Sequence, residues 1–156
     1  MKLNKKGLLI QLEPEDKITE HFKFKEFCKR DVVPFEHYGD LIHLCRLLEH
    51  IRAMARVSLQ ITSGYRSPEH NREVADSDIS QHSFMRAVDF RPVLTVPVDV
   101  ANRIVLNLFR DLKKNAKLLS IGGLGYYKEN AKYPRARIHV DQRPIVIGQS
   151  LVTWEV

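Results

Sequence analysis

The sequence predicts an α+β fold in which helices pack against a small, mostly antiparallel sheet. Residues 40–55 and 101–112 repeat apolar residues at helical spacing, whereas several shorter stretches have the length and composition of strands. A chain of 156 residues is long enough to bury about two-thirds of its unfolded surface. We find no internal repeat and no low-complexity run. We therefore expect residues 1–20 to form an arm or edge strand and residues 21–156 to form one domain.

The spacing of aromatic and aliphatic residues predicts the first two helices of the chain. Phe22, Phe24 and Phe27 stand where a short helix could anchor the chain to a core. A core helix of about 16 residues then follows over 40–55, with Asp40 as its N-cap. Its apolar stripe consists of Leu41, Leu44, Leu48, Ile51 and Ala55.

Turn-forming residues divide the rest of the chain into shorter elements. Ser67 followed by Pro68 is typical of a helix start, and Pro92 and Pro97 bracket a turn. The expected elements are a strand at 59–62, a short helix at 68–75, a loop at 76–83, a strand at 86–91, a helix from 101 to about 113–115, paired strands at 121–127 and 137–142, and an edge strand at 151–154.

Composition and charge limit the class of protein. Apolar residues make up 44% of the chain and charged residues 28%, and no stretch approaches the roughly 20 apolar residues of a membrane span. The basic start has an apolar run only at residues 8–10, too short for a signal peptide, so we expect cytoplasmic synthesis without an export signal. Cys28 and Cys45 form no metal-binding pair and are expected as free thiols. The net charge of +6 favours an anionic partner, which could be nucleic acid, a membrane face or a bacterial wall.

Three residues with the chemistry of zinc ligands stand out in the second half of the chain. His82 and Asp89 are seven residues apart, and His139 follows in the segment Arg137-Ile-His-Val-Asp141. A catalytic zinc takes three ligands from His, Asp or Glu and keeps one position open, whereas structural zinc is usually closed by four ligands, mostly Cys. Spacing alone is weak evidence in a chain with seven His and nineteen acidic residues, so the expectation of one Zn²⁺ per chain bound by these three residues rests on the segments around them.

Other histidines fit bystander roles better. His43 and His50 fall opposite the apolar stripe of the first long helix, together with Arg46, and are expected to face solvent. His70 falls on the predicted short helix, where an isolated histidine is more often a bystander than a ligand.

The sequence segments around the three candidate ligands resemble those of the LAS zinc metallopeptidases. The matching phrases, in the family's order, are Ser63-Gly-Tyr-Arg-Ser-Pro-Glu-His-Asn71, Ser80-Gln-His82, Ala87-Val-Asp-Phe90, Gly122-Gly-Leu-Gly-Tyr-Tyr127 and Ile138-His-Val-Asp141. The family includes zinc D-alanyl-D-alanine carboxypeptidases, VanX-type dipeptidases and phage L-alanyl-D-glutamate endopeptidases, with the hedgehog N-terminal domain as a relative. The resemblance runs from about residue 21 to about residue 143 and implies a hedgehog/D-Ala-D-Ala-peptidase-like sheet that carries the zinc.

The resemblance also implies roles for residues around the metal. Arg66 matches the position whose guanidinium steadies the substrate carbonyl and the charge that grows on it. Ser80 matches the serine two residues before the first zinc histidine and is expected to line the site or to cap a neighbouring backbone. Tyr126 is a further expected substrate-binding residue.

The chain departs from the family pattern at the general base. Several members carry Glu or Asp three residues before the last zinc histidine, and here that position is Ala136. Asp141, two residues after His139 on the same strand face, is then either the base or a group that orients His139. Glu129 is a weaker candidate for the base.

Two further departures affect the shape of the site. Met85 replaces a glycine that either adopts a conformation closed to other residues or makes room near the metal. Ala75-Asp76 replaces a common Gly-Gly. The resemblance therefore supports zinc binding more strongly than it supports the family's substrate specificity.

The resemblance implies a zinc peptidase that cuts the stem peptide of bacterial peptidoglycan, such as a phage or prophage endolysin or a virion-associated hydrolase. A zinc-binding but inactive structural or recognition module is the alternative, favoured by Ala136 and Met85. A basic nucleic-acid-binding domain is a distant third hypothesis, because we find no aromatic-basic stacking motif.

Overall fold

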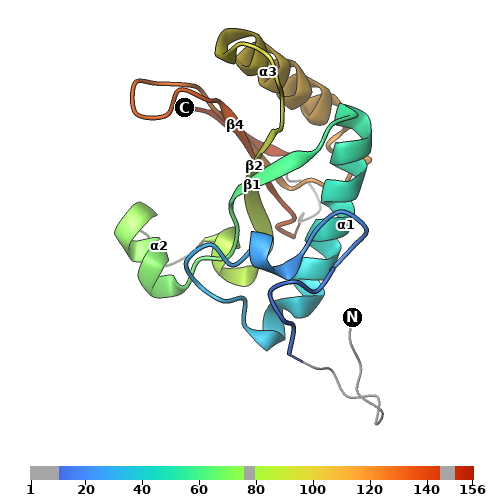
Figure 1. The fold of residues 1–156 in the computed structure, drawn as a ribbon, viewed down its shortest axis with the longest axis vertical. Helices are drawn as coiled ribbons and strands as arrows, with labels where there is room; N and C mark the ends of the chain where they lie inside the picture. Colours follow the sequence, from blue (N-terminus) through green and yellow to red (C-terminus); the bar gives the residue numbers. More distant parts are fainter. Residues whose placement is uncertain (1–10, 76–79, 145–149) are drawn as a thin grey trace.

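A mixed sheet forms the centre of the computed structural model, which describes residues 11–75, 80–144 and 150–156 (Figure 1). Within these residues the sheet has five strands, and three α-helices surround it (Figure 1). The strands are β1 Leu59–Ser63, β2 Ala87–Pro92, β3 Gly123–Tyr127, β4 Arg137–Asp141 and β5 Val152–Glu155. The helices are α1 Tyr38–Ala55, α2 Pro68–Ala75 and α3 Val98–Asn115, with short 3₁₀ helices at Phe24–Glu26, Phe35–His37 and Gln81–Phe84.

The strand order is β1-β2-β4-β3-β5. The pairs β1–β2, β2–β4 and β3–β4 are antiparallel, and β5 joins β3 in parallel. The predicted α+β class and the mostly antiparallel sheet are therefore confirmed. All five expected strands form, within a few residues of their predicted bounds.

Strand alternation gives the sheet one apolar and one polar face. Alternate side chains of β2, β3 and β4 are aliphatic or aromatic and wholly buried, and α1 and α3 pack on this face (Figure 1). These buried residues are Val88, Phe90, Leu124, Ile138 and Val140. The opposite face carries Asp89, Arg91 and His139, and α2 lies apart from the other two helices (Figure 1). Hydrophobic burial thus stabilises one face and leaves the other for polar chemistry.

Helix α1 is the predicted core helix, but it starts two residues earlier than expected. Tyr38 is buried against Phe24 and Phe35, at ring-centroid distances of 5.6 and 5.3 Å, and this packing draws it into the first turn. The prediction that Asp40 is the N-cap is therefore wrong. Asp40 lies inside the first turn and accepts a hydrogen bond from Arg86 Nε at 3.0 Å.

The exposed face of α1 is the one that the sequence predicts. His43, Arg46 and His50 are all exposed. None of the helices in the described residues has the length and hydropathy of a membrane span.

The segment before α1 packs against the core through its aromatic residues. Phe22, Phe24 and Phe27 are buried, and the short helix expected there is the 3₁₀ helix Phe24–Glu26. Of the predicted arm, residues 1–10 lie outside the described residues. Leu12 is buried and its N–H donates to Tyr38 Oη at 3.1 Å, so the second half of the predicted arm contacts the core.

The predicted loop at 76–83 is corrected in its last part. Residues 76–79 lie outside the described residues, whereas Gln81–Phe84 form a 3₁₀ helix. Ser80 caps this helix because its Oγ accepts a hydrogen bond from the His82 N–H at 3.2 Å.

Glu49 ties the N-terminal segment to α1. Its carboxylate accepts hydrogen bonds from Thr19 Oγ1 at 2.7 Å and from the N–H and Nδ1 of His21 at 2.9 and 2.8 Å. Burial alone would raise the pKa of Glu49, but these hydrogen bonds outweigh it and lower the pKa below its ordinary value. A carboxyl whose pKa is lowered by folding stabilises the folded state above its unfolded pKa.

We expect Glu49→Gln to lower the free energy of unfolding at pH 7 by about 1–2 kcal/mol, the usual loss for hydrogen bonds to a charged group. The difference from the wild-type chain should shrink as pH falls through the lowered pKa, because the native carboxylate is then protonated as well. Urea unfolding at pH 7 and at lower pH values measures both effects. Glu69→Gln, at an exposed position on α2, is the control. A difference independent of pH would contradict the assigned role of the charge.

Candidate metal centre

Two histidines and one aspartate converge on the polar face of the sheet. One ligand atom from each of His82, Asp89 and His139 lies within 4.8 Å of the others, and all three residues are buried. Asp89 Oδ1 is 2.9 Å from His139 Nδ1 and 3.5 Å from His82 Nε2. Among the residues that the structure describes, no other group of three His, Cys, Asp or Glu side chains comes together in this way.

Sheet register brings two of the three side chains together. Asp89 on β2 and His139 on β4 are directly paired residues of an antiparallel ladder. Directly opposite residues have Cβ atoms about 4.5–5.5 Å apart on the same face, so their side chains meet without a special loop. The 3₁₀ helix that Ser80 caps supplies His82.

Hydrogen bonds at the far side of each ring orient the imidazoles. The Nδ1–H of His82 donates to the carbonyl oxygen of Gly64 at 2.7 Å, because that oxygen can only accept. His82 therefore presents Nε2 to the cluster. His139 Nε2 lies 3.1 Å from Asp141 Oδ2, so His139 presents Nδ1. Such partners fix the tautomer and the ring orientation of metal-binding histidines.

Charges within the cluster shift the pKa values of its members. Burial lowers the pKa of His82. Burial would also lower the pKa of His139, but its hydrogen bonds to Asp141 and Asp89 outweigh this effect and raise it. Burial would raise the pKa of Asp89, but hydrogen bonds from the two histidines hold it far below its ordinary value. The cluster therefore contains a permanent carboxylate between two oriented nitrogen donors.

This donor set fits zinc. Two imidazole nitrogens and one carboxylate oxygen are ligands that catalytic zinc sites use, and each imidazole here already has its outer partner. A fourth position can face the hollow of about 380 Å³ that His82 and His139 line.

Arg66 lies at the edge of the cluster. Its Nη2 donates to Asp89 Oδ2 at 3.2 Å and lies 3.2 Å from His82 Nε2, and its Nε donates to Ser63 Oγ at 3.1 Å. The side chain is largely but not wholly buried, and it lines the hollow. A fixed cation therefore stands beside the metal group.

Asp141 lies behind His139 rather than in front of it. Its side chain is wholly buried, and Oδ2 contacts the His139 nitrogen that points away from Asp89. Arg143 donates to Oδ1 through its N–H at 3.1 Å and through Nε at 2.8 Å, and its Nη2 contacts Oδ2. Burial would raise the pKa of Asp141, but the hydrogen bonds from Arg143 and His139 lower it well below its ordinary value.

Gly123 allows Asp141 to occupy this position. A Cβ at Gly123 would lie 2.1 Å from Asp141 Oδ2, so a larger residue there would displace the carboxylate. The glycine in the Gly122–Tyr127 phrase is therefore explained by the close approach of a carboxylate that contacts His139.

The two tyrosines of β3 face opposite ways. Tyr126 is buried on the apolar face against Phe109 of α3, with ring centroids 5.5 Å apart, and does not lie where a substrate-binding residue is expected. The neighbouring Tyr127 lines the hollow at the metal group instead. The sequence phrase contains both tyrosines, and only the strand register distinguishes them.

Trp154 and Arg143 are site residues that the sequence analysis missed. Trp154 on β5 packs against His139 with ring centroids 4.9 Å apart, and both Trp154 and Arg143 line the hollow. A Cβ at Gly125 would lie 2.5 Å from Trp154 Cε2, so the glycine makes room for the indole. The alternating glycines of β3 are the one sequence signal that could have indicated these close neighbours.

The remaining candidates do not join the cluster. Ala136 is wholly buried and its N–H donates to Asn102 Oδ1 at 2.9 Å. The residues lining the hollow do not include Glu129. His70 lies on α2 as predicted, with Nδ1 2.7 Å from Asp31 Oδ2, and is not a member of the metal group.

Met85 shows why the family has glycine at its position. Its backbone is left-handed, with φ 53° and ψ 28°, and it ends the 3₁₀ helix that carries His82. A residue with a Cβ pays roughly 1–2 kcal/mol for this conformation. Its side chain is wholly buried, so apolar packing offsets part of the strain.

Fold and cluster together define a protein with a candidate metal centre on the open face of a sheet. A family model described as Peptidase M15 matches residues 17–141. The chain therefore belongs to the M15 peptidases, a zinc-dependent metallopeptidase family, and this confirms the resemblance to the LAS enzymes. A comparison with curated proteins and a comparison with solved structures found no match.

We expect His139→Ala to lose most of its zinc, because the substitution removes one of three ligands and leaves the Asp89 charge without its closest hydrogen-bond donor. Metal analysis of the purified, dialysed protein measures the loss. His70→Ala is the matched control, since His70 pairs with Asp31 outside the cluster, and it should retain wild-type zinc. Full zinc retention in His139→Ala would contradict the assigned ligand set.

Proposed function

We propose that the chain is a zinc-dependent peptidase that hydrolyses a peptide bond in the stem peptide of bacterial peptidoglycan. The observation that carries the proposal is the buried His82–Asp89–His139 group, whose imidazoles are oriented by outer hydrogen bonds and face a hollow. Membership of the M15 peptidases supports the same reaction class.

The three residues would hold one zinc ion. When bound, zinc polarises the scissile carbonyl and lowers the pKa of a coordinated water to about 7. Arg66 stands beside the ligands with its guanidinium on Asp89, where it can donate to the substrate carbonyl oxygen as negative charge develops there. Ser80 holds the 3₁₀ helix that carries His82 and lines the hollow.

Geometry favours an orienting role for Asp141 over a role as general base. Its carboxylate contacts the outer nitrogen of His139 and is neutralised by Arg143, and its lowered pKa makes it a weak proton acceptor. We propose that Asp141 holds the ring of His139 and increases its basicity as a ligand.

We further propose a setting at the bacterial cell wall, with the chain acting as a phage or prophage endolysin or a virion-associated hydrolase. The resemblance to the LAS enzymes supports this setting, and the net charge of +6 suits an anionic wall. The enzyme would act after release from the cytoplasm or when carried by a virion.

An inactive zinc-binding module is the second candidate. The observation that favours it concerns the described residues, among which Ala136 occupies the position where the base is expected and Arg143 binds Asp141.

Zymography on purified peptidoglycan, with mass spectrometry of the released fragments, tests the proposal and identifies the bond cleaved. His82→Ala is the negative control. Zinc binding without release of any fragment from several peptidoglycan types would favour the inactive module.

We expect Arg66→Ala to lower kcat by about 10²–10³-fold, the usual loss for one donor to a developing oxyanion. Zinc content and thermal stability should change little, because Arg66 is not a ligand. Arg103→Ala, at an exposed position on α3, is the control and should keep full activity. Parallel losses of zinc, stability and activity would make Arg66 a structural residue instead.

Asp141→Asn distinguishes the two roles of that carboxylate. If Asp141 orients His139, we expect zinc affinity or activity to fall by about 10–100-fold. A general base would instead show full zinc retention with a loss of about 10²–10⁴-fold in activity. Zinc titration and peptide hydrolysis, measured on one preparation, separate the outcomes, with Asp111→Asn on the surface of α3 as the control.

A further inference from the structure

A second, larger hollow adjoins the metal group on the polar face of the sheet. It has a volume of about 1020 Å³ and shares Arg66 and Tyr127 with the hollow at the metal group. Its walls come from β1, from α2 and from the segment that leads into β4. A ligand that reaches the metal group can therefore extend into this space.

The larger hollow is strongly cationic. Among the described residues that line it, five have cationic side chains and only one has a carboxylate. That residue is Asp89, which belongs to the metal group. The cationic residues are Lys29, Arg66, Arg91, Arg135 and Arg137. Asp89 already accepts hydrogen bonds from Arg66 and His139, so its charge is compensated within the metal group.

Arg91 is held in the hollow by a neutral partner. It follows Asp89 by two residues on β2, so the two side chains lie on the same face of the sheet. Its Nε donates to Gln60 Oε1 at 2.8 Å on the neighbouring strand. Gln60 and Arg91 are paired residues of the β1–β2 ladder, so the strand register positions this guanidinium. Its charge is therefore oriented but not neutralised.

The neighbours of Arg91 add positive charge. Arg135 lines the same hollow as Arg91, so the two guanidiniums add to its positive charge. Arg137 stacks on Tyr127 and Tyr133, at 4.3 and 5.3 Å from the ring centroids, and contributes no negative charge. No carboxylate in residues 11–75, 80–144 and 150–156 lies within ion-pair distance of Lys29, Arg91 or Arg135.

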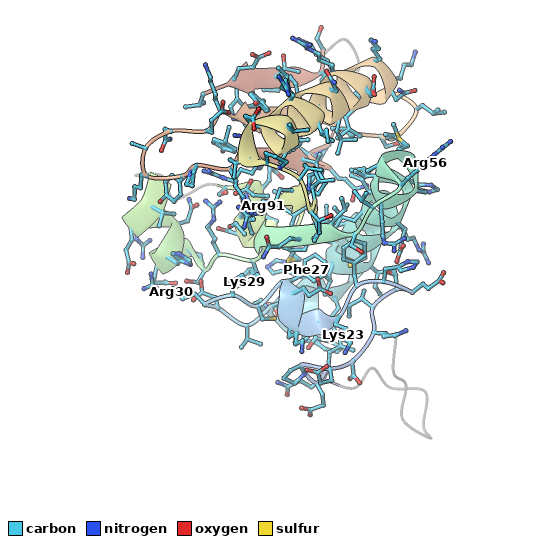
Figure 2. All side chains as sticks on the ribbon, turned by 45° about the horizontal axis from the view of Figure 1, so that its top comes forward. Lys23, Phe27, Lys29, Arg30, Arg56 and Arg91 are labelled. Atoms are coloured by element: carbon cyan, nitrogen blue, oxygen red, sulfur yellow. The ribbon has the colours of Figure 1, made fainter. Side chains whose placement is uncertain are left out.

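Two cations close in sequence to Lys29 and Arg91 are paired, unlike Lys29 and Arg91 themselves. Arg30, next to Lys29 in the chain, pairs with Glu73 at 2.6 Å, and Arg86 pairs with Asp40 at 3.0 Å. Figure 2 shows Lys29, Arg30 and Arg91 on the part of the molecule where α2 lies beside the sheet. Lys29, Arg91 and Arg135 therefore line one hollow without an ion-pair partner among the described residues.

We propose that Lys29, Arg91 and Arg135 form an anion subsite that binds a carboxylate side chain of the peptide whose scissile bond lies at the metal group. The place of this subsite in the reaction rests on the proposed function. The binding of a carboxylate at the subsite needs no zinc. A guanidinium presents a planar pair of N–H donors that matches a carboxylate, and charge-assisted hydrogen bonds of this kind are roughly twice as strong as neutral ones.

A peptide fits the hollow better than a nucleic acid does. Proteins that bind single strands stack bases on open aromatic faces. Here Arg137 already covers a face of Tyr127 and of Tyr133, two of the tyrosines that line the hollow. The hollow also leads to a group with the composition of a peptidase metal site. An acidic peptide therefore satisfies both the charge and the geometry.

Calorimetric titration of the full chain with matched peptides tests the subsite. The probes are the acetylated and amidated tetrapeptide Ala-Glu-Glu-Ala and its neutral counterpart Ala-Gln-Gln-Ala. We expect the acidic peptide to bind at least about tenfold more tightly at low salt, and added salt to reduce this preference. Arg91→Gln and Arg135→Gln should each reduce it severalfold, and Arg103→Gln on α3 should leave it unchanged.

Several results would overturn the subsite. These are equal affinity for the two peptides, an unchanged preference in both subsite variants, or competition by inorganic phosphate as strong as that of the acidic peptide. Tighter binding of a single-stranded oligonucleotide that is lost in the same variants would identify a nucleic-acid site instead. Arg135 is exposed in the segment before β4, so Arg135→Gln tests the proposal even if Arg91→Gln affects folding.

The same titration with His139→Ala separates this proposal from the proposed function. Charge-dependent peptide binding should persist without the zinc ligand, because none of the three subsite residues belongs to the metal group. Retained binding together with no release of wall fragments would refute the peptidase function alone. Loss of the charge preference with intact wall hydrolysis would refute the subsite alone.

Discussion

The pairing of β2 with β4 is the constraint on which the candidate site depends. Its register sets Asp89 opposite His139, with Gly125 of β3 opposite His139 on the other side. A shift of β2 by one residue would turn Asp89 toward α1 and α3 and bring Val88 or Phe90 to the polar face. The wholly buried residues of the apolar face resist that shift, so the packing that stabilises the sheet also specifies the metal geometry.

Buried charge at the site is compensated in layers. Asp89 receives hydrogen bonds from Arg66 and His139, His139 is held by Asp141, and Asp141 is neutralised by Arg143. Each of these partners lowers the free-energy cost of burying the charge that it contacts, because an unpaired buried charge strongly destabilises the fold. The arrangement directs His82 Nε2, His139 Nδ1 and Asp89 Oδ1 toward one another, with Arg66 Nη2 3.2 Å from His82 Nε2.

Stability and chemistry are assigned to opposite faces of one sheet. The face under α1 and α3 is aliphatic and aromatic, and the open face holds the metal group, the hollows and the unpaired cations. Cations brought together without partners repel each other, so they weaken the fold slightly where they gather. A hollow with this charge is consistent with a ligand that supplies carboxylates, and the apolar face provides the stability that the open face lacks.

Local patterns in the sequence were enough to predict the α+β class, the long helices and the strands, because each depends on residue type and short-range spacing. The three candidate ligands were predicted from segments that resemble those of the LAS enzymes. The start of α1 was misplaced, since the packing of Tyr38 against Phe24 and Phe35 moves it. Only the tertiary structure decided that Tyr127 rather than Tyr126 lines the site, that Trp154 covers His139, and that Arg143 binds Asp141 behind that ring. These facts depend on strand register and on the approach of segments distant in the chain, which no local pattern encodes.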